Sequence, residues 1–341
     1  MSAAALLGAC AAAQAVDAEV DRETHIRLAS SVLKIEVLNR GGGYSLGSGV
    51  LIDRDEVVTS CHVTRNAQRI HVLQGGLRLA ATGQSAQMRR DLCVLRVPGV
   101  LGQVVATAPT QSLKAGDAVI AVGYTGGLAP YASAGKVIAK HRHSEGQVIR
   151  SSTSFNSGAS GGGLFDTQGR LLGILTFRMR GAEGQYFSVP SDWIAPALHA
   201  PSAFGPVGPL EGLAFWEATD AAQPPFLQAA TLKAQQQWQS LAGLSRRWAH
   251  EDPKDGDAFH HLADALEHLG DLEGAEGALT RSALLEPDEP RGWLQLGQLR
   301  ARMGRLADAG QALLRLRALA AAAAPHATEW ADDLARLLDK R

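Results

Sequence analysis

A glycine-rich stretch around Ser160 constrains this chain more than any other part of its sequence. Residues 156–165 read Asn-Ser-Gly-Ala-Ser-Gly-Gly-Gly-Leu-Phe. Glycines allow backbone conformations that a Cβ atom forbids, so this loop can direct several N–H groups at one point. A serine hydroxyl at that point could attack a carbonyl carbon, and the N–H groups could hold the resulting oxyanion. Taken alone, the stretch is equally compatible with an ordinary surface turn.

A serine nucleophile needs a base, and the base needs a carboxylate to orient it. His62 follows the β-branched run Val57-Val58-Thr59, and Asp91 opens an apolar run that continues to Val97. The chain order is therefore His62, Asp91, Ser160. Each residue has its own local context, and the combination is far more specific than any one motif.

The segments around these three residues resemble trypsin-like serine peptidases of the HtrA/Deg type. The resemblance covers roughly residues 28–198. It departs at Gly163, where proline is usual, and at Ala159, where Asn or Asp is usual. The segments that carry it are Gly47–Ile52, Thr59–Val63, Asp91–Leu95, Gly116–Gly123, Ala134–Val137, Asn156–Phe165 and Phe187–Pro190.

The resemblance implies two six-stranded β-barrels with an active site in the cleft between them. Ser160 would be the nucleophile, His62 the general base and Asp91 the group that fixes the histidine tautomer. In the segment Gly158-Ala159-Ser160, the N–H groups of Gly158 and Ser160 would form the oxyanion hole.

The same resemblance places the substrate. Ser154 should lie near the base of the pocket for the residue before the scissile bond. Leu175, Thr176 and Phe177 should form an edge strand that pairs with the substrate backbone. Because Ser154 is not acidic, we expect small or medium apolar residues to be preferred over Lys or Arg.

Short β-rich runs separated by turn residues independently predict an all-β barrel or sandwich. Hydrophobic residues make up 45% of the 341-residue chain, enough for a sizeable core, and the length favours about two domains. The expected strands are 31–39, 48–53, 56–59, 69–73, 77–82, 92–97, 118–122, 135–140, 147–152, 171–178 and 185–189.

Beyond residue 225 the composition becomes helical and repeats with a period of 34 residues, the tetratricopeptide (TPR) length. Phe259 and Trp293 are one period apart, as are Gly270 and Gly304, which should turn the chain between paired helices. Two repeats are predicted, at about 256–289 and 290–323. Residues 226–250 resemble a degenerate preceding pair, and residues 327–340 a capping helix.

The predicted organisation therefore has four parts. Residues 1–25 are an alanine-rich export-signal remnant or a disordered tail, 26–200 a protease domain, 201–225 a Pro/Gly-rich linker or wrapping segment, and 226–341 an all-α TPR-like repeat domain. The repeats either bind protein or peptide partners on a concave surface, or only pack on the protease. A PDZ-like segment, usual in HtrA proteins, is not recognised after residue 200.

The leading functional hypothesis is a serine endopeptidase that cleaves protein or peptide substrates through an acyl-enzyme. The alternative is a catalytically inactive or partner-gated protease-fold scaffold that acts mainly through its repeats. Lys plus Arg (33) nearly balances Asp plus Glu (34), which argues against nucleic acid as a partner. No stretch approaches the length of a membrane span. No metal or cofactor is expected.

The N-terminus is alanine-rich, with Ala13-Gln14-Ala15 resembling a signal cleavage site and Leu7–Cys10 a lipoprotein box. The basic segment of a signal is missing, so we expect an export signal whose start is lost, and a periplasmic or secreted protein. A lipoprotein is a minor alternative, and a cytoplasmic location stays open.

The cysteines and two histidines leave further choices open. The resemblance places the strands of Cys61 and Cys93 close enough for a disulfide, but two separate buried thiols are the preferred interpretation. His141 and His143 are expected in a solvent-exposed loop rather than at a metal.

Overall fold

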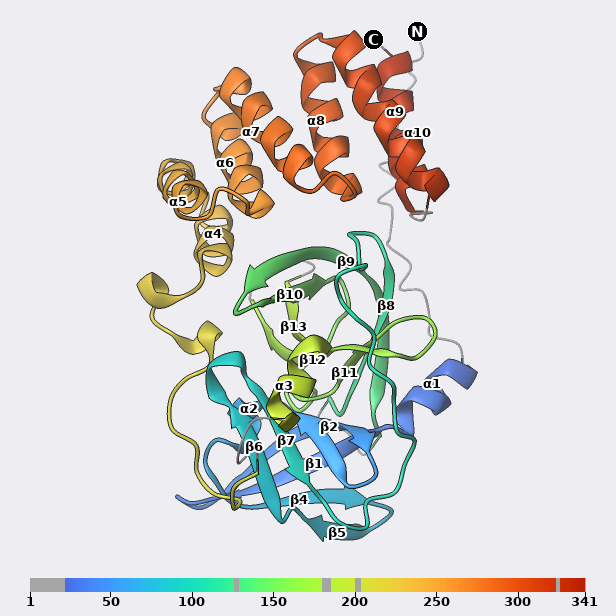
Figure 1. Ribbon diagram of the computed structural model, residues 1–341, viewed down its shortest axis with the longest axis vertical. Coiled ribbons are helices and arrows are strands. Elements are labelled where there is room, and N and C mark those ends of the chain that lie inside the picture. The colour runs from blue at the N-terminus through green and yellow to red at the C-terminus, as the bar shows by residue number, and fades with distance from the viewer. Residues whose placement is uncertain (1–21, 126–128, 180–184, 200–203, 323–325, 341) are drawn as a thin grey trace, which may run out of the picture.

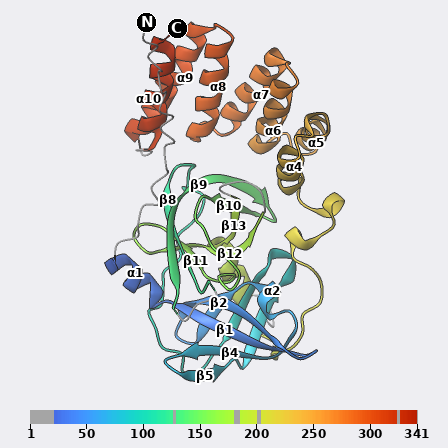
Figure 2. The same ribbon diagram turned by 180° about the vertical axis from the view of Figure 1, so that it is seen from behind.

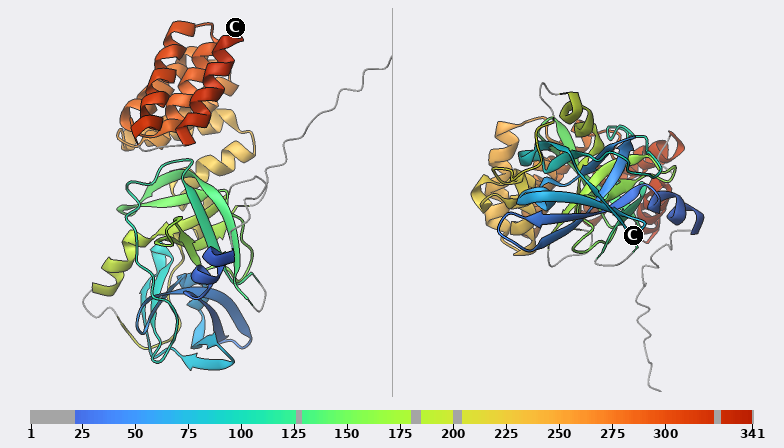
Figure 3. Two further views of the ribbon diagram at one scale, coloured as in Figure 1. Left: turned by 90° about the vertical axis from the view of Figure 1, so that its right-hand side faces the viewer. Right: turned by 90° about the horizontal axis from the view of Figure 1, so that it is seen from below.

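The computed structural model describes residues 22–125, 129–179, 185–199, 204–322 and 326–340. Two β-rich halves are stacked on each other, and a layer of helices covers the end of the second half that faces away from the first (Figure 1). The same stacking is evident from behind and from the side (Figures 2 and 3). The predicted signal segment falls on residues 1–21, outside the described residues.

The first half is a seven-stranded antiparallel sheet that follows helix α1 (Arg22–Ala29). Its strand order is β5-β4-β1-β2-β3-β7-β6, with β5 and β6 at the two edges, so the predicted six-stranded barrel is wrong for this half. At the β6 edge, Gln84 forms an antiparallel bridge with Gly205, which occupies backbone groups that closure would need. The strands are β1 (Val32–Asn39), β2 (Tyr44–Asp53), β3 (Glu56–Thr59), β4 (Ala67–Gln74), β5 (Leu77–Ala80), β6 (Gly83–Gln87) and β7 (Leu92–Arg96).

The second half is a closed six-stranded barrel in the order β10-β13-β12-β11-β8-β9, as the resemblance implied. A closed barrel removes the unpaired edges of a sheet. Its strands are β8 (Ala118–Gly123), β9 (Tyr131–His143), β10 (Gly146–Ser151), β11 (Gly163–Phe165), β12 (Leu171–Arg178) and β13 (Tyr186–Pro190).

Alternation of apolar and polar residues explains the first strand. Ile35 and Val37 are fully buried, whereas Lys34 and Glu36 between them are partly exposed. Two glycines in β2 let it lie close to its neighbours. A Cβ atom on Gly47 would come within 2.5 Å of Val63, and one on Gly49 within 2.5 Å of Val57. The Gly-Ser-Gly pattern of this strand is therefore a packing requirement.

Helices follow the barrel. Gly270 (φ +85°) and Gly304 (φ +77°) lie between paired helices in the left-handed conformation, as the sequence predicted. Helix α8 begins 34 residues after α6, and α9 begins 34 residues after α7. The helices are α2 (Cys61–Thr64), α3 (Ile194–His199), α4 (Pro225–Ala234), α5 (Trp238–Glu251), α6 (Gly256–His268), α7 (Leu272–Leu285), α8 (Pro290–Arg302), α9 (Leu306–Ala322) and α10 (His326–Asp339).

The helices and the barrel share one apolar core. Phe187 of β13 and Phe226 of α4 belong to the same buried cluster. His141 of β9 lies between the two layers, stacked on Phe226 and bonded to Asp257 of α6. The expectation that His141 and His143 occupy an exposed loop is wrong, because β9 extends to His143 and the helices cover it. His141 is 3% exposed and His143 is half-buried.

Within the described residues, no helix has the length and apolar character that crossing a bilayer requires. The described part of the chain also contains no group of three or more His, Cys, Asp or Glu arranged to hold a metal ion.

Candidate active site

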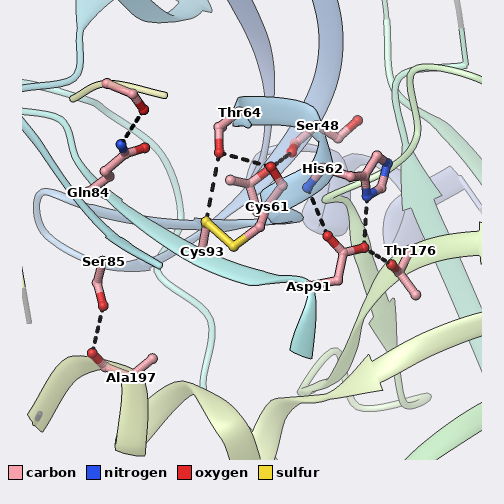
Figure 4. Close-up of a disulfide and its surroundings, with 12 residues drawn as sticks. Ser48, Cys61, His62, Thr64, Gln84, Ser85, Asp91, Cys93, Thr176 and Ala197 are labelled. Carbon is pink, nitrogen blue, oxygen red and sulfur yellow. Dashed lines mark hydrogen bonds and ion pairs between the residues drawn. A yellow bond between two sulfur atoms is a disulfide. The ribbon is translucent and has the colours of Figure 1, made fainter. Parts of the chain in front are cut away.

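His62 and Asp91 form a tight pair next to the Cys61–Cys93 disulfide (Figure 4). His62 lies on the short helix α2, and its Nδ1 is 2.7 Å from Asp91 Oδ2. The His62 backbone N–H donates to the other carboxylate oxygen, Oδ1, at 2.8 Å. The side chain of Asp91 is fully buried, whereas that of His62 is 18% exposed. The carboxylate therefore orients the imidazole and leaves part of the ring exposed to solvent.

Asp91 occupies an unusual backbone conformation. It ends a 3₁₀ turn with φ 55° and ψ 35°, directly before β7. The left-handed region is uncommon for residues other than glycine, although Asp tolerates it better than most. Its N–H donates to the carbonyl of Met88 at 3.0 Å, which holds the turn in place. Such strain commonly occurs where a side chain must be aimed accurately.

A disulfide joins the elements that carry this pair, so the preference for separate thiols is wrong. Cys61 and Cys93 are bonded, with their Cα atoms 4.9 Å apart. The sheet register accounts for it, because Thr59 of β3 lies opposite Cys93 of β7. Cys61 directly precedes His62, and Cys93 is two residues after Asp91 (Figure 4). The sequence could not fix this register, and two buried cysteines look the same with or without a bond.

Thr176 connects Ser160 to the His62–Asp91 pair by hydrogen bonds. The Ser160 hydroxyl donates to the Thr176 carbonyl at 3.2 Å, and the Thr176 hydroxyl donates to Asp91 Oδ2. Strand β2 of the first half also holds the serine loop, because the Ser48 N–H donates to the Ser160 carbonyl at 2.8 Å. The structure thus gathers the three predicted residues around Thr176, with the hydroxyl hydrogen of Ser160 directed to a carbonyl in this conformation.

The loop geometry distinguishes the amides expected at the oxyanion hole. Gly158 has φ +95°, a conformation that requires glycine in practice. Its carbonyl accepts a hydrogen bond from Ser48 Oγ at 2.8 Å, which turns the peptide in one direction. The N–H of Ala159 donates to the Asn156 carbonyl at 3.0 Å, so that amide is already paired. Gly158 and Ser160 are therefore the amides of this segment best suited to the role.

Of the residues expected to contact substrate, Ser154 lies beside Ser133 and the other three lie on β12. Ser154 shares hydrogen bonds with Ser133, whose Oγ lies 3.1 Å from Ser154 Oγ. The two side chains that meet here are hydroxyls and carry no charge. Strand β12 is not simply an edge strand, because it lies between β11 and β13. However, β11 pairs only with residues 171–174, so no described strand pairs with Thr176 and Phe177 on that side. Leu175 is already bonded, since its carbonyl accepts from the Gly161 N–H at 2.7 Å.

Two further residues at this site were not identified from the sequence. Ser48 braces the serine loop, and its only signal was its place in the Gly-Ser-Gly strand. Trp216, from the predicted linker, donates its indole N–H to Asp91 Oδ2 at 3.0 Å. Its ring also meets the His62 ring edge-on, with centroids 5.2 Å apart. A tryptophan 125 residues after Asp91 gave no sequence signal of this contact.

A cavity of about 360 Å³ lies beside the serine loop. Tyr44 and Leu46 of β2 line this cavity and are 61% and 49% exposed. Gly158 of the serine loop also lines it. Tyr124 also lines this cavity, and burial raises the pKa of its phenol above the ordinary value. The site therefore combines the polar network with an apolar recess next to the expected oxyanion amides.

Comparison with known proteins finds similarity to trypsin-like peptidases. Residues 47–174 match the family model described as "Trypsin-like peptidase domain". The chain is 31% identical over 163 residues to "Serine protease HTRA4" of Homo sapiens, covering 45% of this chain and 34% of that protein. It is 35% identical over 160 residues to "Periplasmic pH-dependent serine endoprotease DegQ" of Escherichia coli, covering 43% of this chain and 35% of that protein.

A solved structure shares the fold of the two β-rich halves. The active form of the Rv3671c protease from M. tuberculosis has a TM-score of 0.50 and 25% sequence identity, and covers 56% of this chain and 88% of that one. The chain spans about a third of the length of the two curated relatives. It thus carries a trypsin-like peptidase domain with homologues among HtrA-type serine proteases, followed by a helical region.

Proposed function

We propose that this trypsin-like domain is a serine endopeptidase in which Ser160 is the nucleophile, His62 the base and Asp91 the residue that orients it. The observation that carries the proposal is the 2.7 Å contact between His62 Nδ1 and a fully buried Asp91. A buried carboxylate in this position fixes the imidazole tautomer and stabilises the imidazolium that forms during catalysis. It leaves Nε2 as the ring atom available to a serine.

The proposed reaction begins when the Ser160 hydroxyl turns from the Thr176 carbonyl to His62 Nε2. His62 takes the proton while Ser160 Oγ attacks the peptide carbonyl carbon, and the Gly158 and Ser160 N–H groups receive the oxyanion. His62 then returns the proton to the leaving amine, and water releases the acyl group by the reverse sequence. The uncharged Ser154, at the expected bottom of the substrate pocket, favours small or medium apolar side chains before the scissile bond.

We propose that residues 26–200 carry the catalysis, that 201–225 wrap back onto that domain, and that 226–341 are TPR-like repeats that bind protein or peptide partners. The 34-residue offset between successive helix pairs supports the repeat assignment. A periplasmic or secreted location is proposed from the "periplasmic" descriptions of relatives such as DegQ.

A fluorophosphonate probe tests the nucleophile. We expect the full chain to be labelled and to cleave casein, and Ser160→Ala to lose both while it keeps its fold by circular dichroism. The matched control is Ser112→Ala, an exposed serine in a loop of the same domain. Labelling that persists in Ser160→Ala would assign the reactive group elsewhere, and an unlabelled wild type would favour the scaffold alternative.

A further inference from the structure

The segment between barrel and helices is anchored on the first sheet before it reaches the active site. Gly205 exchanges two 2.9 Å backbone hydrogen bonds with Gln84 of β6. The Leu210 N–H donates to the Arg65 carbonyl at 2.8 Å, and the Arg65 guanidinium lies 2.6 Å from Glu217. Figures 1 and 2 both show this segment running beside the sheet before it rises to α4. It is therefore a wrapping segment with a defined path.

Trp216 lies at the point where this segment meets the His62–Asp91 pair. Its indole N–H is 3.0 Å from Asp91 Oδ2, and its ring stacks on Phe177 with centroids 5.1 Å apart and planes inclined by 16°. Its carbonyl accepts from Gln223 Nε2 at 2.9 Å, which fixes the backbone on the far side. The indole is thus held by two rings, one carboxylate and its own backbone.

The Asp91 carboxylate shares its charge among several donors. Oδ2 accepts from His62 Nδ1, from the Thr176 hydroxyl and from Trp216 Nε1. A buried carboxylate needs such donors, because leaving a buried charge unpaired is costly. Trp216 also covers one side of the His62–Asp91 contact with an apolar ring. The charged groups on or beside this segment are the Arg65–Glu217 ion pair and the exposed Glu211 and Asp220. Burial lowers the pKa of His143, which packs against Phe215, to about 4, so this imidazole is neutral at pH 7.

We propose that Trp216 is a positioning residue of the active site, which holds the Asp91 carboxylate against His62 from outside the trypsin-like domain. This proposal rests on the proposed function, since it assigns Trp216 a part in that reaction. Its consequence is that the segment leading to the helices completes the catalytic network. Catalysis in this chain then depends on a residue beyond the matched residues 47–174.

Trp216→Phe in the full chain removes the N–H and keeps an aromatic ring. We expect kcat for a peptide substrate to fall about tenfold, the usual size for one hydrogen bond to a charged group, with KM little changed. The acidic limb of kcat/KM should move to higher pH by about half a unit, because a carboxylate with fewer donors stabilises protonated His62 more strongly. The matched control is Trp238→Phe, in which the lost indole stacks on His268 of the helices.

A kcat and a pH profile equal to those of wild type in Trp216→Phe would overturn the proposal. So would a KM effect alone, which would make Trp216 part of the substrate surface. A readout without turnover covers the case in which this variant does not fold or the wild type is inactive. In full-length Ser160→Ala, NMR should show the Trp216 indole proton shifted downfield, protected from exchange and close in space to the His62 ring. An ordinary, rapidly exchanging indole proton there would contradict the proposal even if the chain proves to be an active peptidase.

Discussion

The His62–Asp91 pair near Ser160 and the His141–Asp257 pair between barrel and helices have nearly the same geometry. Their Nδ1–Oδ2 distances are 2.7 Å and 2.6 Å. Their surroundings differ. The His62 side chain is 18% exposed, whereas the side chains of His141 and Asp257 are each only 4% exposed. A hydrogen bond from histidine Nδ1 to a carboxylate is therefore not enough for a general base. The second ring nitrogen, Nε2, must also be accessible to a substrate or nucleophile.

The surroundings of the interface pair favour one protonation state for each residue, a neutral His141 and an ionised Asp257. Burial lowers the pKa of His141, so the imidazole stays neutral. His141 and the Arg291 guanidinium, 3.5 Å from Asp257, hold the pKa of that carboxyl below its usual range even though burial opposes this. Stacking on Phe226 at 4.6 Å closes one face of the imidazole. The same residue pair thus fastens two parts of the molecule where solvent is excluded.

The largest expected effect separates the two pairs by catalysis. Asp91→Asn should lower kcat by about 10⁴, because an amide stabilises the wrong tautomer of His62. The matched Asp257→Asn should leave kcat within about twofold, since this pair lies between the barrel and the helices and not beside Ser160. Steady-state hydrolysis of a peptide substrate measures both. Similar losses in the two variants would remove the functional distinction between the pairs.

The second largest expected effect is the contribution of the interface pair to the free energy of unfolding. Asp257→Ala leaves His141 and Arg291 without their buried partner and should cost about 3–5 kcal/mol in free energy of unfolding. The control is Asp252→Ala, which breaks an exposed pair with Arg142 and should cost below about 1 kcal/mol. Urea denaturation of the full chain measures both losses in free energy of unfolding. Equal losses in the two variants would show that the interface pair does not stabilise the contact between barrel and helices.

A disulfide bond distinguishes the His62–Asp91 pair from the interface pair. The Cys61–Cys93 bond closes 32 residues of sequence separation, and its loss should cost about 3 kcal/mol. We expect Cys61→Ala combined with Cys93→Ala to unfold at a lower temperature than the oxidised wild type. Reductant should bring the wild type to about the level of the variant. A wild type equally stable with and without reductant would show that the bond adds nothing to folding.

The smallest expected effect is on the pH dependence of the free energy of unfolding. His141 and Asp255, both at the interface between barrel and helices, contribute to it with opposite signs. The lowered pKa of His141 means that its contribution to stability is lost as pH falls below its unfolded value of 6.5. Burial and the nearby Asp257 raise the pKa of Asp255 to about 7, so its contribution is present at acidic pH and is lost as pH rises toward 7.

Two variants separate these contributions. His141→Gln should flatten the loss of stability on the acidic side. Asp255→Asn keeps an oxygen for the helix cap and should gain on the wild type as pH rises from 4 to 7. Thermal unfolding across that range measures both. Parallel curves for the variants and the wild type would mean that neither group titrates as its surroundings require.

Much of the fold was readable because it depends on local patterns. The expected strand 56–59 is β3 and the expected strand 171–178 is β12, since both are apolar runs between turns. Strands β6 and β11 were missed. The first, Gly-Gln-Ser-Ala-Gln, lacks apolar alternation, and the second has only three residues inside the glycine-rich stretch.

The sequence by itself determined the chain order His62, Asp91, Ser160, the glycines that allow the serine loop, and the 34-residue helical period. These follow from residue type and spacing, which act locally. Only the tertiary structure decided that Cys61 bonds to Cys93, that His141 is buried against Asp257 and that Trp216 reaches Asp91. Each of these contacts joins residues distant in sequence, and the packing of whole sheets and helices, rather than any local pattern, sets such distances.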